Sequence, residues 1–119
     1  MQSLSRRPDG STVLTVSGRV DADGASRLAR LLHPATMPTT HLVLDMSGVT
    51  VLGAEGLAVL VDTSARLREH GGRLTIAIGD RLGAVLRAVE DARLERTLPL
   101  FDTVEHALAA PATREPATQ

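Results

Sequence analysis

Residues 41–60, HLVLDMSGVTVLGAEGLAVL, constrain the fold more than any other part of this chain. They begin with a short apolar run that ends in an acid, and residues 47–53 then suggest a turn around a second apolar run. Small residues from Gly53 onward begin a helix. This order predicts a buried strand, a tight loop and a helix N-terminus in close succession. Ligands and partners commonly bind at such junctions in open α/β sheets, so we expect the functional surface here.

The chain before this junction opens with a predicted hairpin. Residues 1–7 are weakly apolar and suit an edge strand, and residues 12–16 form a β-branched run that suits a second strand. Between them, Pro8 and Gly10 flank Asp9 in a strong turn signal. The two strands should therefore pair antiparallel at one edge of the sheet.

A loop and a first helix are predicted to follow this hairpin. Residues 17–24 are rich in Gly and Asp and suggest a loop, while residues 25–32 carry apolar side chains at helical spacing. Asp23 or Gly24 could cap this helix. The two prolines within residues 33–40 should end it.

The helix that starts after Gly53 has the clearest pattern in the chain. Asp62, Arg66 and Glu69 are spaced for ion pairs on its polar side, and Gly71 and its neighbours should end it. Its opposite stripe, at helical spacing, consists of Leu57, Leu60, Val61, Ser64 and Leu67.

The remaining elements alternate in type. Residues 73–78 read as a buried strand, and Leu82, Val85, Leu86 and Val89 mark a third helix. Residues 98–101 suggest a short last strand. Asp102 and Thr103 can cap a final helix over residues 104–108.

This order predicts an α/β fold with a small mixed sheet. We expect four to five strands, an antiparallel hairpin at the N-terminus, parallel crossovers elsewhere and about four helices packed on the sheet. Residues 1–109 should form a single domain. Residues 110–119 mix Ala, Thr and Pro without periodicity and should be a disordered tail.

Composition excludes several classes of function. The net charge of −1 gives no bulk attraction to nucleic acid, and the absence of cysteine excludes disulfides and thiolate chemistry. No apolar run is long enough to insert into a membrane, and no signal peptide is visible, so a cytoplasmic protein is expected. All thirteen basic residues are Arg, which suggests a bacterial genome of high GC content.

No catalytic or metal-binding pattern is present in the sequence. The four histidines lack metal-ligand spacing, and without lysine no phosphate-binding loop of the Walker type can form. Asp45 ends a strand, where enzymes often place an acid, but the favoured interpretation is that it orders the following turn by accepting backbone N–H bonds. We therefore expect no catalytic residue, cofactor or metal. These histidines are His33, His41, His70 and His106.

The order of these parts resembles the STAS family of anti-sigma factor antagonists and related regulatory domains. Four segments carry the resemblance: SGRVDADGASRL at residues 17–28, LVLDMSGVTVL at residues 42–52, the helix from Gly56 that ends in GGRL, and LPLFDTVEHAL at residues 98–108. The resemblance implies the fold of that family, with helices packed against a sheet.

One segment departs from the family pattern. The long helix of the family begins D-S-[SA]-G-[LI], and a partner kinase that is also the anti-sigma factor phosphorylates the serine. Here Gly53 stands in place of the aspartate, Ala54 in place of the serine and Glu55 in place of a small residue. Ala54 has no hydroxyl and cannot accept a phosphate. The phosphorylation switch of the family is therefore absent at this position.

Three interpretations of Glu55 remain open. The first is a favourable acid in the first turn of a helix, worth about 0.3–1 kcal/mol. In the second, the protein is an antagonist that cannot be switched off, and in the third Glu55 mimics a phosphate in part and blocks a kinase. Ser47 and Thr50 are nearby hydroxyls that could be modified instead, although both suit structural roles.

The resemblance implies a regulatory binding module rather than an enzyme, which docks on an anti-sigma factor or a histidine-kinase-like serine kinase. The alternative is an accessory STAS subunit of a membrane transporter or of a stress-signalling assembly. Self-association is left open. Asp21 matches the family acid in the loop after the second strand, although it could also be a loop or cap residue. The residues expected to bind the partner are Asp21, Gly53, Ala54, Glu55, Gly56, Leu57, Ala58 and Asp62.

Overall fold

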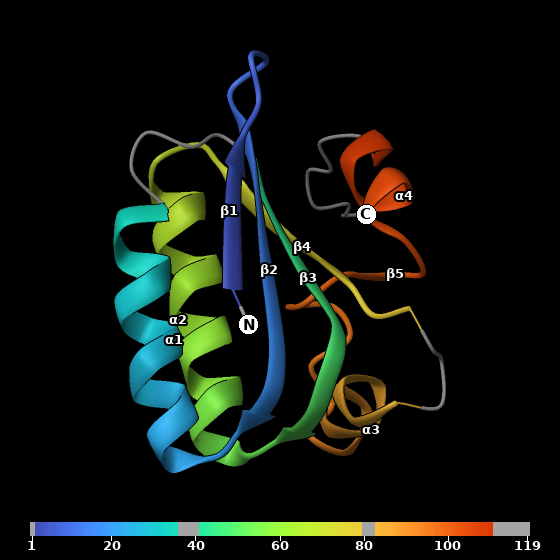
Figure 1. The fold of residues 1–119 in the computed structure, drawn as a ribbon. Coiled ribbons are helices and arrows are strands. Elements are labelled where there is room, and N and C mark those ends of the chain that lie inside the picture. The colour runs from blue at the N-terminus through green and yellow to red at the C-terminus, as the bar shows by residue number, and fades with distance from the viewer. Residues whose placement is uncertain (1, 36–40, 80–82, 111–119) are drawn as a thin grey trace.

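The computed structural model describes residues 2–35, 41–79 and 83–110. Over these residues it contains five strands and four helices (Figure 1). Their bounds are β1 Gln2–Arg6, β2 Ser11–Val20, α1 Ala22–Ala35, β3 His41–Leu52, α2 Ala54–Glu69, β4 Arg73–Ala77, α3 Ala84–Asp91, β5 Leu100–Phe101 and α4 Val104–Ala109. The predicted mixed α/β fold is confirmed.

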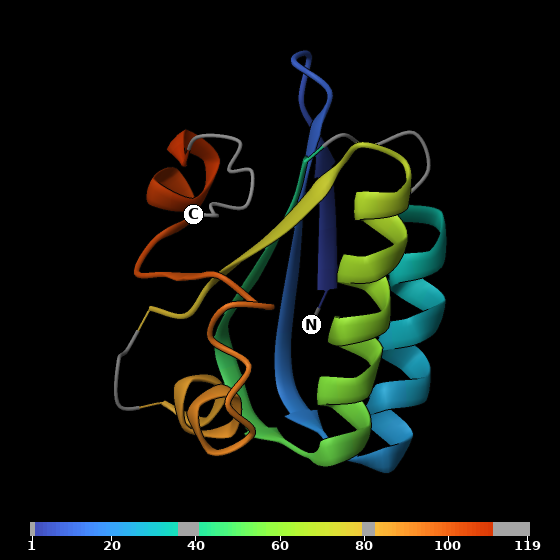
Figure 2. The same cartoon turned by 180° about the vertical axis from the view of Figure 1, so that it is seen from behind.

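The five strands form one sheet in the order β1-β2-β3-β4-β5. β1 pairs antiparallel with β2, and every other neighbouring pair is parallel. Helices α1 and α2 cover one face of the sheet, and α3 and α4 cover the other (Figures 1 and 2). The central strand is therefore buried on both faces, which explains its continuous apolar run at Leu42, Val43 and Leu44.

The core is almost entirely aliphatic. Because the chain has a single Phe and no Tyr or Trp, leucine and valine side chains from both layers of helices fill the space around the sheet. The largest fully buried side chains are Leu28, Leu32, Leu42, Leu44, Met46, Leu60, Leu67, Ile76, Leu98, Val20, Val43 and Val89.

The opening hairpin forms as predicted. Gly10 takes a φ of 92°, and the Arg7 N–H donates to the Ser11 carbonyl at 2.8 Å, which closes the turn. The Asp9 carboxylate accepts bonds from the backbone N–H and the hydroxyl of Ser11, at 3.0 and 2.6 Å.

The predicted loop over residues 17–24 is wrong. β2 continues to Val20 because it pairs with β3 as far as Leu52. The pairing of its polar, glycine-containing part is irregular, with register shifts between Thr15 and Ser17 and between Gly18 and Arg19. Gly18 has a φ of 92° in this irregular part. α1 then begins at Ala22 and is capped by Asp21, not by Asp23 or Gly24. The helix extends to Ala35, past the expected break, and residues 36–40 lie outside the described residues.

The turn expected at residues 47–53 is also wrong. β3 continues to Leu52, since Ser17 pairs with Gly48 and Val20 pairs with Leu52 across the parallel ladder. A Cβ on Gly48 would lie 2.9 Å from the Cβ of Ser17, so the glycine permits this close approach. The two long strands carry the chain to one end of the sheet, where α1 and α2 begin.

The later elements agree with the sequence prediction, apart from small shifts of their ends. α2 ends where Gly71 takes a φ of 80° and the Gly72 N–H bonds to the Leu67 carbonyl at 2.7 Å. Thr103 caps α4, because its Oγ1 accepts from the His106 N–H at 3.1 Å. Leu82 and residues 111–119, for which a helix and a tail were expected, lie outside the described residues.

Candidate partner-binding surface

The end of β2 and the start of α2 are joined by a backbone hydrogen bond. The Gly53 N–H donates to the Val20 carbonyl at 3.0 Å, and the Leu57 N–H then bonds to the Gly53 carbonyl at 3.1 Å as the helix begins. Asp21 directly follows Val20 in the chain. The loop that contains Asp21 and the first turn of α2 are therefore held side by side.

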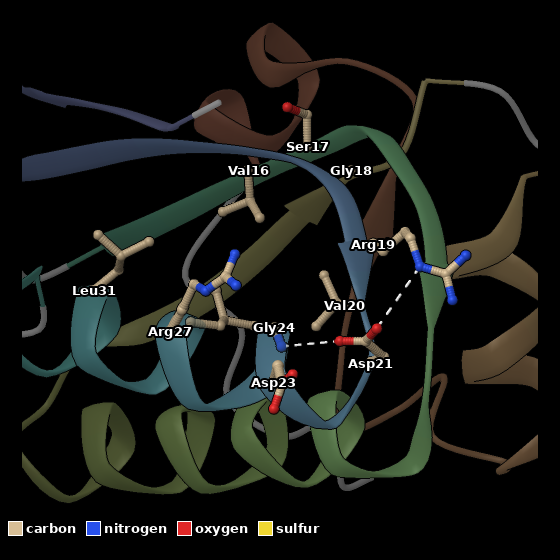
Figure 3. A pocket seen from close by; sticks show the side chains of 11 residues that line it. Val16, Ser17, Gly18, Arg19, Val20, Asp21, Asp23, Gly24, Arg27 and Leu31 are labelled. Atoms are coloured by element: carbon tan, nitrogen blue, oxygen red, sulfur yellow. Dashed lines mark hydrogen bonds and ion pairs between the residues drawn. The ribbon is translucent and has the colours of Figure 1, made fainter.

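Asp21 has a structural role at the start of α1. Its Oδ1 accepts from the Gly24 N–H at 3.0 Å, and Arg19 Nε lies 3.7 Å from its Oδ2 (Figure 3). The hydrogen bond from Gly24 lowers the pKa of the Asp21 carboxyl, and the Arg19 charge lowers it further. The cap residue therefore carries a negative charge at neutral pH, and half of its side chain remains exposed.

The first turn of α2 presents small residues and one acid. Ala54 and Glu55 are exposed, and Gly53 is the N-cap, without a side-chain cap bond. Glu55 Oε1 lies 3.5 Å from the position that a Cβ on Gly53 would occupy. The carboxylate therefore bends back toward the helix N-terminus, where the unpaired N–H groups favour a negative charge.

Gly56, in contrast, lies beneath this surface. A Cβ here would be 2.7 Å from both Leu52 Cδ1 and Val20 Cγ1, so the glycine allows α2 to pack closely on the strand ends. Farther along α2, Leu57 is partly buried and Ala58 is exposed. Of the residues expected to bind a partner, Gly56 is thus the one that the structure places in the interior.

Asp62 lies on the exposed side of α2, one turn beyond Ala58. Its Oδ2 is 3.0 Å from Arg66 Nε, which is the pair that the sequence predicted, and both side chains are more than half exposed. An exposed pair of this kind contributes little stability, so its charges remain available to a partner.

An apolar groove of about 580 Å³ runs along α2. Its far wall comes from the segment that follows α3, which turns back toward α2 (Figure 2). Nothing in the local sequence marks Ala65, Ala92 or Leu94 as site residues, because the folded chain brings the end of α3 next to α2. The groove is lined by Ala54, Leu57, Ala58, Val61, Asp62, Ala65, Ala92 and Leu94.

A second, polar pocket of about 370 Å³ lies between the end of β2 and α1 (Figure 3). Arg19 and Arg27 contribute cations to its lining, while Asp21 and Asp23 contribute acids. The charges are balanced, so the pocket does not select one sign of ligand. Arg27, which has no motif to mark it in the sequence, lines the pocket from the exposed side of α1.

Two of the described histidines, His41 and His70, form hydrogen bonds within the protein. His41 Nε2 lies 2.9 Å from Thr75 Oγ1 in the interior, and burial, together with the nearby Arg73 charge, lowers the pKa of His41 to about 4. His70 Nδ1 lies 2.8 Å from the Arg66 carbonyl oxygen, and His106 is exposed. The side chain of His33 lies outside the described part of the chain.

Asp45 orders the residues that follow it, as one of the two interpretations predicted. Its Oδ1 accepts from the Ser47 N–H at 3.1 Å and from the Ser47 hydroxyl at 2.7 Å. Ser47 and Thr50 are both exposed. Within residues 2–35, 41–79 and 83–110, the structure shows no group of three or more His, Asp or Glu residues that could hold a metal ion.

Comparisons with known proteins agree with this architecture. The family model described as "Mlab, STAS domain" matches residues 3–101. The anti-sigma-F factor antagonist RsfB of Mycobacterium tuberculosis H37Rv is 30% identical over 101 residues, which cover 84% of this chain and 80% of RsfB. RsfA of the same strain, also an anti-sigma-F factor antagonist, is 29% identical over 113 residues, which cover 92% of this chain and 87% of RsfA.

A solved structure of an anti-sigma factor antagonist has the same fold as this chain. The crystal structure of an anti-sigma factor antagonist from Mycobacterium paratuberculosis superposes with a TM-score of 0.80 and 28% identity, over 91% of this chain and 90% of that one. This chain belongs to the STAS family. In the described part of the chain, none of the helices is both long and apolar enough to span a membrane.

Proposed function

We propose that this protein is an anti-sigma factor antagonist that binds its anti-sigma factor through the loop at Asp21 and the first turns of α2. The observation that carries the proposal is the hydrogen bond from Gly53 to the Val20 carbonyl, which joins these two segments into one surface. The similarity to RsfB and RsfA, which are named anti-sigma-F factor antagonists, supports the class of partner.

The charge of this surface supports a basic partner. Asp21, Glu55 and Asp62 are acids with exposed or half-exposed side chains, and Arg19 and Arg66 are the cations that lie next to two of them. Complementary charges speed association and fix the orientation of the partners. The anti-sigma factor should therefore present Arg or Lys to this end of the molecule.

Ala54 makes the regulation of this surface different from the phosphorylation switch of the family. An exposed methyl group at the first turn cannot carry a phosphate, and Glu55 provides a permanent negative charge beside it. We propose that the charge state of the docking surface is constant. Control of the protein would then act through its abundance or through the partner.

Binding titrations test the proposal. Each anti-sigma factor of the source genome is purified and titrated calorimetrically with the full chain, and at least one should bind. Glu55→Gln should weaken that complex about tenfold because it removes a charge from the interface. Asp21→Asn should act in the same direction while it keeps an oxygen for the Gly24 N–H.

Glu105→Gln is the matched control, since Glu105 is also an exposed first-turn acid but belongs to α4 on the other face of the sheet. It should leave the affinity unchanged. If no anti-sigma factor binds the wild-type chain, the proposed function is wrong. Equal weakening by Glu55→Gln and Glu105→Gln would show that the complex uses a different surface.

A further inference from the structure

We infer that the groove along α2 receives the apolar face of a helix of the anti-sigma factor, and that this helix places a basic side chain next to Asp62. The inference rests on the proposed function and specifies which part of the partner the surface binds. Ala65 and Leu94, at the far end of the groove, then belong to the interface together with the first turn of α2.

The shape of the groove fits a helix. Ala54, Ala58 and Ala65 carry only methyl groups, so they leave space between the partly exposed side chains of Leu57 and Val61. The lining runs from residue 54 to residue 65, a distance of about 16 Å at the rise of an α-helix, or roughly three turns. Helices that bind in such grooves insert side chains spaced three or four residues apart.

The far wall of the groove is fixed by backbone hydrogen bonds. Beyond the C-cap of α3, Arg93 takes the left-handed conformation, at a φ of 58°, and the Leu94 N–H bonds back to the Val89 carbonyl at 2.9 Å. The Ser64 hydroxyl donates to the Thr97 carbonyl at 3.4 Å, which ties this segment to α2. The groove is therefore preformed, which lowers the entropy lost when a helix binds.

The charge of the groove selects the partner. Among the described residues of its lining, Asp62 is the one that carries a charge, and Glu55 lies two turns earlier on the same helix. A basic side chain on the partner would compete with Arg66 for the Asp62 carboxylate, and the existing exposed pair opposes this only weakly. A second copy of this chain fits less well, because a symmetric contact through this face would bring these acids together.

Substitution of Ala65 tests the inference, because Ala65 lies about three turns from the start of α2. Ala65→Glu should weaken binding to the anti-sigma factor found in the titrations about 30-fold, since it puts a charge into the apolar floor. Ala29→Glu is the control, because Ala29 is exposed on α1, outside the groove lining. Asp62→Lys should weaken binding about tenfold by repelling the basic side chain.

NMR of the wild-type chain tests the inference without a substitution that could disturb folding. With alanine and leucine methyl groups labelled for NMR, a saturating amount of the anti-sigma factor should shift the signals of Ala58, Ala65 and Leu94. Unchanged signals at these methyls, or wild-type affinity of a folded Ala65→Glu variant, would overturn the inference.

The outcomes separate the two proposals. If Glu55→Gln weakens the complex but Ala65→Glu does not, the proposed function stands and the groove is not part of the interface. If no anti-sigma factor binds the wild-type chain, both proposals fail. If sedimentation shows a wild-type dimer that Ala65→Glu dissociates, the groove binds a second copy, and the inference is overturned.

Discussion

Single residues at the start of α2 decide both how closely the helix packs and what chemistry it offers. Gly56 lies inside and permits close packing on Val20 and Leu52, whereas Ala54 and Glu55, two positions and one position earlier, face solvent. The same turn is therefore structural on one side and available to a partner on the other. Substitutions in this turn should separate into effects on stability and effects on binding.

Ala54 should remain unmodified by a kinase. We expect incubation of the wild-type chain with its anti-sigma factor and ATP to leave residue 54 without phosphate, because a methyl group offers no oxygen for phosphoryl transfer. Intact-mass spectrometry measures this directly. A mass increase of one phosphate, mapped to Ser47 or Thr50, would show that a different hydroxyl serves as the switch.

Gly56→Ala should destabilise the protein by about 1–3 kcal/mol, because the added Cβ forces the buried ends of Leu52 and Val20 to move. Gly53→Ala is the matched substitution in the same turn. A Cβ at residue 53 would make only ordinary contacts, at 3.5 Å or more. The free energy of unfolding should therefore fall by less than about 1 kcal/mol. Urea unfolding of both variants measures the difference, and equal losses would contradict the packing argument.

His41 should make stability depend on pH between about 6.5 and 4. Its pKa falls from 6.5 to about 4 on folding, so within this range the unfolded chain binds a proton that the folded chain does not. Stability should therefore decrease as the pH falls, by at most about 1.4 kcal/mol per pH unit.

His41→Gln keeps a group that can bond to Thr75 but cannot titrate. Urea midpoints at several pH values between 7 and 4 should therefore vary less in this variant than in the wild type. Identical pH dependence in the two proteins would show that His41 is not the group responsible.

At the scale of the elements, the two long strands determine where the proposed partner-binding surface lies. β2 and β3 pair over nearly their whole length and end together at Val20 and Leu52. Each strand then passes directly into a helix, so the starts of α1 and α2 lie next to each other. The Asp21 carboxylate caps the first of these helices and also faces solvent beside the second.

Two substitutions separate the contribution of the Asp21 cap to stability from that of its charge. Asp21→Ala should lower the Tm by roughly 4 °C because α1 loses its N-cap. Asp21→Asn retains an oxygen that can accept a hydrogen bond from the Gly24 N–H, so its Tm should be closer to that of the wild type. Thermal melts followed by circular dichroism distinguish the two, and an equal drop in both variants would mean that the charge, not the cap, stabilises α1.

The whole molecule is a sheet covered on both faces, with its described C-terminal helix packed on β3 and β4. Residues 111–119 carry no apolar periodicity, so the prediction of a disordered tail remains to be tested. A chain that ends at Ala110 should have the same Tm as the full chain and the same affinity for the anti-sigma factor. A Tm lower by several degrees would show that these residues contribute to the fold.

Much of the architecture could be predicted from the sequence because local signals agree with the final structure. Gly10, Gly71 and Thr103 end or begin elements through their own backbone or side-chain geometry. The apolar stripe of α2 follows from its helical periodicity, and the buried run of β3 follows from its continuous apolar sequence. The family pattern around residues 53–57 also predicts that the first turn of α2 belongs to a docking surface, which stays a prediction.

Local patterns in the chain are enough to predict the order of strands and helices, the absence of a hydroxyl at residue 54 and the acid at residue 55. Long-range contacts, in contrast, make residues 17–20 a strand, Asp21 the cap and Gly56 buried, because these features depend on the pairing of β2 with β3 and on the packing of α2. The groove likewise exists only because Ala92 and Leu94 come to lie beside Ala65. Contacts between residues far apart in the chain leave no local pattern, and they define the surface that we propose binds the partner.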